Sequence, residues 1–371
     1  MLLNIAAILL SLSFLIVIHE LGHFLAAKKA GVRILEFGIG YPPKAIKLFS
    51  FQGTDFTLNW IPFGGFVRMD GEDALVKEKE KRKKDPQLFF QKNVKQRLYI
   101  VLAGPVVNFL FGILAFFILF MVFGIPLSAA RVGYIEPNSP AESSKLPLGV
   151  NITELVFEDQ TVKTNTPEDV IKAVNDHQGK KVTIITTGGC QRLECDQTRH
   201  EYDSVIRTKE ETPENQGSLG IGFQNSIYYP WYEMPARGLY SAVMQTFSVS
   251  KLVLSSLGTM IGDLITKGQI PQDISGPVGI VYFAQKEDII SQGFLFMLHL
   301  TGMLSVNLAM INILPIPALD GGRALFISLE RFFSKKRLAN LESYANYGGY
   351  ILLLGLIILI TLKDVFMIIK G

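Results

Sequence analysis

The chain has 371 residues, 49% of them hydrophobic, and its mean hydropathy is +0.30. This composition excludes a wholly water-soluble protein and predicts a chain that is partly embedded in a membrane. The formal net charge is only +3, and the sequence contains no recognition module for nucleic acid, so nucleic-acid binding is excluded as well.

The first predicted element is a membrane-spanning helix from Leu2 to Ala27, which is long enough to cross a bilayer. A cleaved signal peptide is the alternative. However, no basic residue precedes the apolar run, and the run continues into His19 and Glu20 instead of a cleavage site. The segment is therefore predicted to remain as a span.

This helix contains His19-Glu20-Leu21-Gly22-His23, the H-E-x-x-H spacing of helical zinc sites. Residues four apart share one helix face, so both imidazoles can bind one ion, and Glu20 can act as the general base that deprotonates the attacking water. A catalytic zinc has three protein ligands, so one more is needed. The alternative is a helix end whose polar residues meet lipid headgroups, but ionisable groups within a span are functional sites by default.

A β-rich stretch follows at residues 36–69, where Phe37-Gly38-Ile39-Gly40 and the segment from Lys44 to Leu58 alternate loosely. Trp60 to Met69 is predicted as another strand that ends in a glycine bend. We expect these strands to form hairpins at the edge of the bilayer beside the metal. The alternative is a small cytoplasmic β-subdomain with no role in substrate binding.

Three further spans are predicted, at Leu98–Ile125, Phe294–Ile313 and Tyr347–Thr361. Lysine and arginine gather between the first and second spans and again between the third and fourth, which predicts that both loops are cytoplasmic and that both termini face outward. Tyr240–Gly262 has one charge, but a span there would move Asp320 to the membrane face opposite His23. It is therefore predicted to lie flat on the outer surface as an amphipathic helix.

Arg131 to Phe223 is predicted to form a small α+β domain outside the membrane, with a helix at Pro167–Asp176 and a strand at Lys181–Thr187. Cys190 and Cys195 flank a short hairpin-like stretch within it. An oxidising outer compartment would permit a disulfide between them, and two free thiols are the alternative.

Asp320 is the best candidate for the third metal ligand. It follows an uncharged stretch at residues 289–319, and irregular backbone at membrane depth is tolerated only where protein or a cavity surrounds it. The alternative is an ordinary helix N-cap for a helix near Arg323–Phe333, and the two roles can coexist. His299 is interpreted as a hydrogen-bonded interior histidine, with a fourth metal ligand or a gating group as the alternative.

Taken together, these strings resemble the bacterial site-2 protease family, intramembrane zinc metalloproteases of the RseP type. The resemblance runs along nearly the whole chain, and its specific element is Asn-x-x-Pro-x-Pro-x-Leu-Asp-Gly-Gly at Asn312 to Gly322 joined to H-E-x-x-H. The other matching strings are Phe37 to Gly40, Pro62 to Val67, Ala103 to Asn108 and Ser275 to Ile280.

The resemblance implies roles for single residues. His19, His23 and Asp320 would bind Zn²⁺, with Glu20 as the general base. Asn312 would hold the substrate backbone, and the strands around Gly38, Gly40 and Leu58 would receive an unwound substrate as an added β-strand.

The resemblance also implies a multi-pass α-helical protein of the bacterial cytoplasmic (inner) membrane with one extracytoplasmic PDZ-like domain. The expected parts are an N-terminal membrane core (1–127), the PDZ-like domain (128–225), the surface helix and linker (226–293) and a C-terminal membrane core (294–371). The implied reaction is cleavage of single-span membrane proteins, often the second cut of regulated intramembrane proteolysis that releases an anti-sigma factor. Alternatives are clearance of signal-peptide remnants or pheromone precursors, a non-catalytic membrane PDZ scaffold, and a transporter, for which no inverted repeat is evident.

This topology predicts that reporters fused after Gly262 and after Arg337 lie on opposite sides of the membrane, because one span separates them. Paired alkaline phosphatase and green fluorescent protein fusions measure this directly. Same-side signals from the two fusions would overturn the predicted topology.

Overall fold

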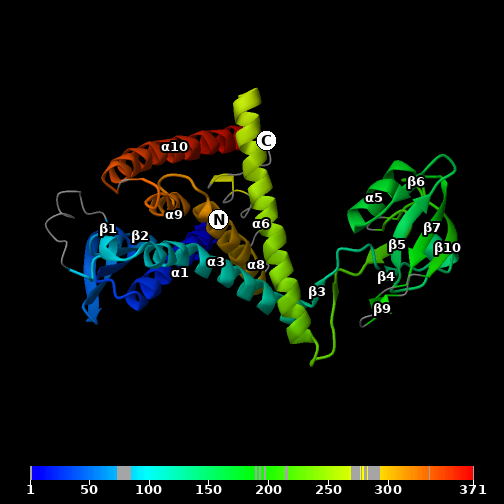
Figure 1. Ribbon diagram of the computed structural model, residues 1–371. Helices are drawn as coiled ribbons and strands as arrows, with labels where there is room; N and C mark the ends of the chain where they lie inside the picture. The colour runs from blue at the N-terminus through cyan, green and yellow to red at the C-terminus, as the bar shows by residue number, and fades with distance from the viewer. Residues whose placement is uncertain are drawn as a thin grey trace. The chain divides into compact units, whose positions relative to one another are not determined.

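The computed structural model describes residues 2–72, 85–188, 190–191, 194–195, 198–213, 216–268, 276, 278–279, 282, 293–333 and 335–370. The chain divides into two units, drawn in Figure 1. One, here called the membrane unit, comprises Met1–Leu119 and Ala242–Gly371, and the other, the β unit, comprises Phe120–Ser241. Each unit is described separately below.

Four helices are long and apolar enough to cross a membrane among the residues that the structure describes: α1 (Leu2–Lys29), α3 (Val94–Phe123), α8 (Phe294–Ile313) and α10 (Lys335–Lys370). At 1.5 Å per residue even the shortest extends about 30 Å, the thickness of the hydrocarbon core. The four predicted spans are confirmed. The fourth helix is longer than predicted, because no helix-breaking residue separates the charged stretch at its N-terminal end from the apolar stretch that follows.

Small residues bring these helices close together. A Cβ on Gly22 of α1 would lie 2.6 Å from the carbonyl oxygen of Ala103 on α3, and a Cβ on Gly112 would lie 2.4 Å from the Val306 side chain on α8. Lipid is as apolar as leucine, so helices in a membrane associate through such close packing rather than through the hydrophobic effect. Gly22 therefore fixes how near the H-E-x-x-H face of α1 lies to α3.

Strands β1 (Ile34–Phe51) and β2 (Thr54–Met69) form one long antiparallel hairpin that folds back on itself. Its register places four segments side by side in the order 44–51, 54–59, 34–39 and 65–69. Gly40 and Gly64, with φ of 81° and 77°, lie at the bends, where L-residues are strained. The strands predicted in this region are confirmed, and the register places the segments 44–51 and 65–69 at the two edges of the sheet, with no further strand paired to them among the described residues.

Strand β2 packs against α1, and the bend where β2 folds back exposes Trp60, Ile61 and Phe63. Contiguous exposed aromatic and aliphatic side chains are typical of a surface that meets lipid. This agrees with the predicted membrane-associated hairpin.

The short helix α9 (Asp320–Leu329) is held from two sides. At the C-terminal end of α9, Glu330 forms an ion pair with Arg97 of α3 through two hydrogen bonds. Both side chains are largely buried, and Nη1 of Arg97 lies 2.7 Å from Oε1 of Glu330. One turn after Asp320, Arg323 forms an ion pair with Glu72, just beyond the end of β2. A buried pair of this kind is costly to break, because the surviving charge would lack a partner.

The β unit is built around a four-stranded antiparallel sheet in the order β10-β7-β5-β6. Its core includes Ile152, Leu155 and Ile184, all fully buried, and each such side chain contributes about 1.5–3 kcal/mol. The long helix α6 (Met234–Lys267) lies mostly in the membrane unit, which also contains a 3₁₀ turn at Phe89–Gln91. The elements of the β unit are β3 (Ile125–Pro126), β4 (Val132–Ile135), α4 (Pro140–Ser143), β5 (Asn151–Val156), β6 (Thr161–Lys163), α5 (Pro167–Asp176), β7 (Lys181–Thr187), β8 (Cys190–Gln191), β9 (Glu194–Cys195), β10 (Arg199–Val205), β11 (Ile221–Phe223) and β12 (Ser226–Ile227).

Within this unit Cys190 and Cys195 are direct backbone partners of β8 and β9. Their side chains lie outside the described residues, so the disulfide stays a prediction. The predicted helix at Pro167–Asp176 and strand at Lys181–Thr187 are confirmed. Helix α6 is not among the membrane-spanning candidates of the described chain.

Helix α5 begins at a capping box. The Thr166 hydroxyl accepts the Asp169 N–H, and the Asp169 carboxylate accepts the Thr166 N–H. Hydrogen bonds from the backbone of Asn165 and Thr166 lower the pKa of Asp169. Because this pKa is lowered in the folded state, the stabilisation is present above the ordinary aspartate pKa and is lost as the pH falls through the native value.

Thr166→Ala should lower the free energy of unfolding of the β unit by about 1 kcal/mol, because α5 loses its N-cap acceptor. Hydrogen exchange of the β-unit amides in the full chain measures this loss. Thr166→Ser, which keeps the hydroxyl, is the matched control, and equal exchange rates in the two variants would contradict the assignment.

Candidate metal centre

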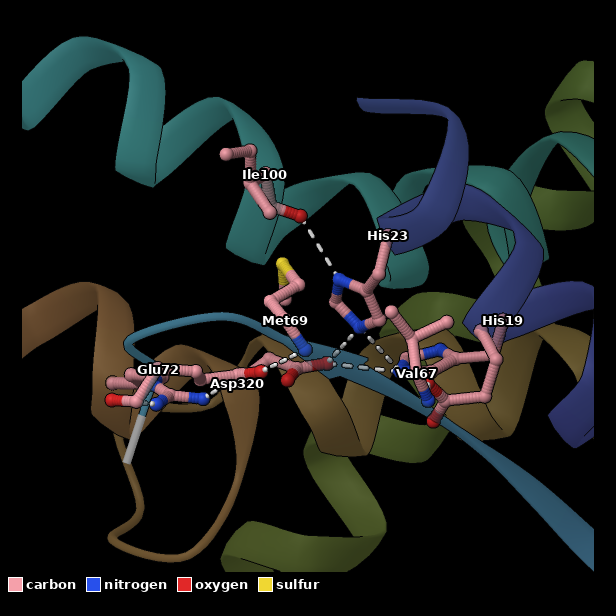
Figure 2. A network of polar contacts seen from close by, with 9 residues as sticks. His19, His23, Val67, Met69, Glu72, Ile100 and Asp320 are labelled. Carbon is pink, nitrogen blue, oxygen red and sulfur yellow. Dashed lines mark hydrogen bonds and ion pairs between the residues drawn. The ribbon is translucent and has the colours of Figure 1, made fainter. Parts of the chain in front are cut away.

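The two histidines of α1 lie one turn apart and face one another. Their Nε2 atoms are 3.2 Å apart, and both side chains are buried. Figure 2 shows the two rings converging on the carboxylate of Asp320. The i, i+4 spacing therefore produces the shared face that the sequence predicts.

Asp320 reaches this pair from 301 positions further along the chain, as the first residue of α9. Its Oδ2 lies 2.9 Å from Nε2 of His19 and 3.4 Å from Nε2 of His23. The N-cap of α9 is Leu319, which makes no side-chain cap. The alternative of Asp320 as an ordinary N-cap is therefore wrong, and its carboxylate is directed at the histidines.

The spacing of these three atoms fits a zinc ion. Tetrahedral zinc with ligands at 2.0–2.1 Å separates its ligand atoms by about 3.3 Å. The three observed separations of 2.9, 3.2 and 3.4 Å lie around that value. Burial would raise the pKa of Asp320, but its hydrogen bonds with the two histidines outweigh this and keep that pKa below its usual range.

The far sides of both imidazoles are also held. The Ile100 carbonyl lies 2.9 Å from Nδ1 of His23 and accepts its N–H, which leaves the Nε2 lone pair free for a metal (Figure 2). On the other ring, the amide of fully buried Asn108 lies 3.3 Å from Nδ1 of His19. The Ser305 hydroxyl donates to the backbone carbonyl of Asn108 at 2.8 Å and fixes this part of α3 against α8.

Gly104 of α3 is the floor of the site. A Cβ there would lie 2.4 Å from Nε2 of His23 and 2.8 Å from Nε2 of His19. No other residue type leaves room for the two rings. Sequence reasoning gave no role to Gly104 or Asn108, although both lie in the string Ala103 to Asn108 that carries the family resemblance.

Glu20 connects the metal cluster to the β-hairpin. It follows His19 directly, and its Oε2 accepts the backbone N–H of Val67 at 3.0 Å. Val67 belongs to the segment 65–69, which is one edge of the hairpin sheet. The carboxylate that sequence predicts as the general base thus lies at this strand edge and accepts one of its outward N–H groups.

None of the remaining predicted residues belongs to the metal cluster of the described chain. Gly38 pairs on both sides, with Phe66 and Thr57, so it occupies an inner strand and cannot itself receive an added strand. Asn312 lies near the end of α8, and its side chain makes no hydrogen bond to another described residue. His299 packs against the Phe116 ring and is not among the metal-binding groups of the described chain.

Comparison with known proteins agrees with this geometry. Residues 7–356 match the model of peptidase family M50. The chain is similar to zinc metalloprotease RasP of Oceanobacillus iheyensis, at 26% identity over 98% of both chains. It is also similar to zinc metalloprotease RasP of Bacillus licheniformis, at 26% over 98% of both chains, and of Geobacillus kaustophilus, at 25% over 95% of both chains.

Gly104→Ala should reduce zinc affinity roughly tenfold or more, because the added methyl group displaces the imidazole rings although the ligand residues themselves are unchanged. Competition with a chelator on the purified full chain measures the affinity. Gly355→Ala on α10, where a Cβ meets nothing within 4 Å, is the matched control. Equal zinc affinity in the two variants would contradict the described packing.

Proposed function

The chain is a membrane-embedded zinc metalloprotease of peptidase family M50, and we propose that it hydrolyses peptide bonds within the membrane-spanning segments of single-pass proteins. The observation that carries the proposal is the convergence of His19, His23 and Asp320 beside Glu20. The two histidines and Glu20 lie on the apolar span α1, and Asp320 begins α9, which follows the span α8 after the segment 314–319. Placing such polar groups in a membrane costs free energy, so their presence there indicates a function.

We assign His19, His23 and Asp320 as the zinc ligands and Glu20 as the general base. Zinc, when bound, supplies a Lewis acid that polarises the scissile carbonyl and makes water acidic enough to be deprotonated. Glu20 takes a proton from the attacking water and delivers it to the amine that leaves. The Val67 N–H holds the Glu20 carboxylate in place, which supports this role.

The substrate is proposed to add as a strand to the edge at 65–69, at the N–H and C=O groups that Glu20 does not occupy. A membrane helix hides its peptide groups, so it has to unwind before cleavage, and an unwound segment needs partners for its N–H and C=O groups. This edge borders Glu20, whereas the edge at 44–51 lies on the far side of the sheet.

Two predicted glycines shape the sheet around that edge, Gly38 directly behind it and Gly40 at the bend that leads to it. A Cβ on Gly38 would lie 2.3 Å from the Phe66 ring, and a Cβ on Gly40 would lie 2.4 Å from the Ile61 carbonyl oxygen. Asn312, with no partner among the described residues, is proposed to hold the substrate backbone from the opposite side of the cleavage point.

The β unit is proposed to be the PDZ-like domain, residues 128–225, on the periplasmic or extracellular side. A cavity of about 620 Å³ between α5 and β11 supports it, with Thr166, Ile171 and Phe223 among its lining residues. PDZ domains take extended peptides along a strand edge. Binding a substrate terminus and excluding substrates with bulky outer domains are both compatible with this cavity.

The proposed biological role is the second cut of regulated intramembrane proteolysis, such as release of an anti-sigma factor into the cytoplasm. The same chemistry suits the clearance of signal-peptide remnants or pheromone precursors. A membrane PDZ scaffold is less well supported, since a non-catalytic protein has no need to keep three ligands and a base together. Comparing the membrane fragments that accumulate with Glu20→Gln and with the active chain identifies the substrates.

Glu20→Gln should lower cleavage of a model membrane substrate about 10²-fold or more while zinc content stays unchanged, because only the proton acceptor is lost. Asp320→Asn should lower zinc content as well as cleavage. In-vitro cleavage and elemental analysis of the full chain measure both. Cleavage that survives Glu20→Gln would sink the mechanism, and full zinc content in Asp320→Asn would remove Asp320 from the ligand set.

A further inference from the structure

A tight turn lies directly before the helix that carries Asp320. The Leu319 N–H donates to the Ile316 carbonyl at 3.2 Å, which closes a four-residue β-turn with Pro317 and Ala318 at its centre. Ala318 has φ of 71°, in the left-handed region that non-glycine residues rarely adopt. Proline in the second position and positive φ in the third are the features of a type II turn.

The sequence of this turn favours a different geometry. A type II turn prefers glycine or asparagine in the third position, whereas Pro-Ala suits the type I turn, in which the third residue has negative φ. The two types differ by a flip of the central peptide group, which consists of the Pro317 carbonyl and the Ala318 N–H. A contact from outside the turn is therefore needed to hold the observed form.

Helix α10 supplies that contact at both ends of the central peptide group. The Ala318 N–H donates to Oδ1 of Asn346 at 3.0 Å. One turn further along, a Cβ on Gly349 would lie 2.6 Å from the Pro317 oxygen, so only glycine lets this carbonyl lie against the helix. In the type I orientation the Ala318 N–H would point away from Asn346, and this hydrogen bond would be lost.

The conformation of the turn determines where α9 starts. Asp320 follows Ala318 by two residues, and Leu319 between them is extended, with φ of −111° and ψ of 165°. Gly321 fits tightly against the carbonyls of Ile313 and Leu314 before the turn, and Gly322 against the Ile316 carbonyl that opens it, so that a Cβ on either would lie 2.2 Å from a backbone oxygen. The Asp320 carboxylate therefore has little freedom to compensate for a change in the turn.

We propose that Asn346 and Gly349 are positioning residues of the metal centre. They hold the turn at Ile316–Leu319 in its type II form, and the turn directs Asp320 at His19 and His23. The inference rests on the proposed role of Asp320 as a zinc ligand. It assigns the fourth span a part in metal binding although that span contributes no ligand.

The test uses the full chain in detergent, with zinc affinity measured by chelator competition and the Co²⁺ absorption spectrum as a readout of ligand geometry. Asn346→Ala should weaken zinc binding roughly tenfold, as expected when a group that orients a ligand is lost. Gly349→Ala should do the same through a steric route. Asn340→Ala, an exposed asparagine on the same helix, is the matched control and should bind zinc as the parent does.

Rescue distinguishes a positioning role from general damage. Ala318→Gly combined with Asn346→Ala should restore zinc affinity to within about twofold and return the Co²⁺ spectrum, because glycine adopts positive φ without help. Equal affinity in Asn346→Ala and Asn340→Ala, or failure of Ala318→Gly to rescue, would overturn the positioning role. Asp320→Asn is measured in parallel, and unchanged affinity there would overturn the ligand assignment itself.

Discussion

Three electron-donating atoms lie within 3.4 Å of one another at the end of a membrane span, and this convergence is the constraint on which the rest of the structure depends. Lone pairs that face each other in a low-dielectric site repel unless a cation lies between them. Gly104 makes the space for this cluster, and Gly22 sets the distance between the helices that form it. The Ile100 carbonyl on α3, which accepts the Nδ1–H of His23, leaves the inward nitrogen of that ring available.

The same setting explains how irregular backbone is accommodated. Unpaired backbone N–H groups cannot be left in hydrocarbon, so each needs an acceptor. Three side chains on the spans, each with an acceptor oxygen, accept such backbone N–H groups. Glu20 accepts from Val67, Asn346 accepts from Ala318, and Asp364 of α10 accepts the N–H groups of Gly276 and Gly279, both at 2.8 Å. Polar residues within the spans thus hold the loops and strand edges from which the site is built.

The sequence predicted what depends on local periodicity or on the chemistry of a motif. The spans followed from apolar runs, the shared face of His19 and His23 followed from helical spacing, and Asp320 followed from the need for a third ligand. The fold-back of the hairpin could not be predicted, because the alternation of Gly38 and its neighbours is the same in an inner strand and in an edge strand. Gly104 and Asn108 were also missed as parts of the site, because a glycine and an asparagine in an apolar run have no chemistry of their own.

The ligands differ in how much support they need. His19 and His23 stand on one continuous helix, so the i, i+4 geometry sets their separation and only their ring orientation requires outside partners. Asp320 comes from a separate segment, and its position has to be imposed by tertiary contacts. The ion pairs of α9 with Arg97 and Glu72, the tight glycines after Asp320 and the strained turn before it all act on this one residue. The least locally determined ligand is therefore the one around which the packing is most constrained, and the geometry of the metal centre is set as much by α3, α9 and α10 as by the helix that carries the histidines.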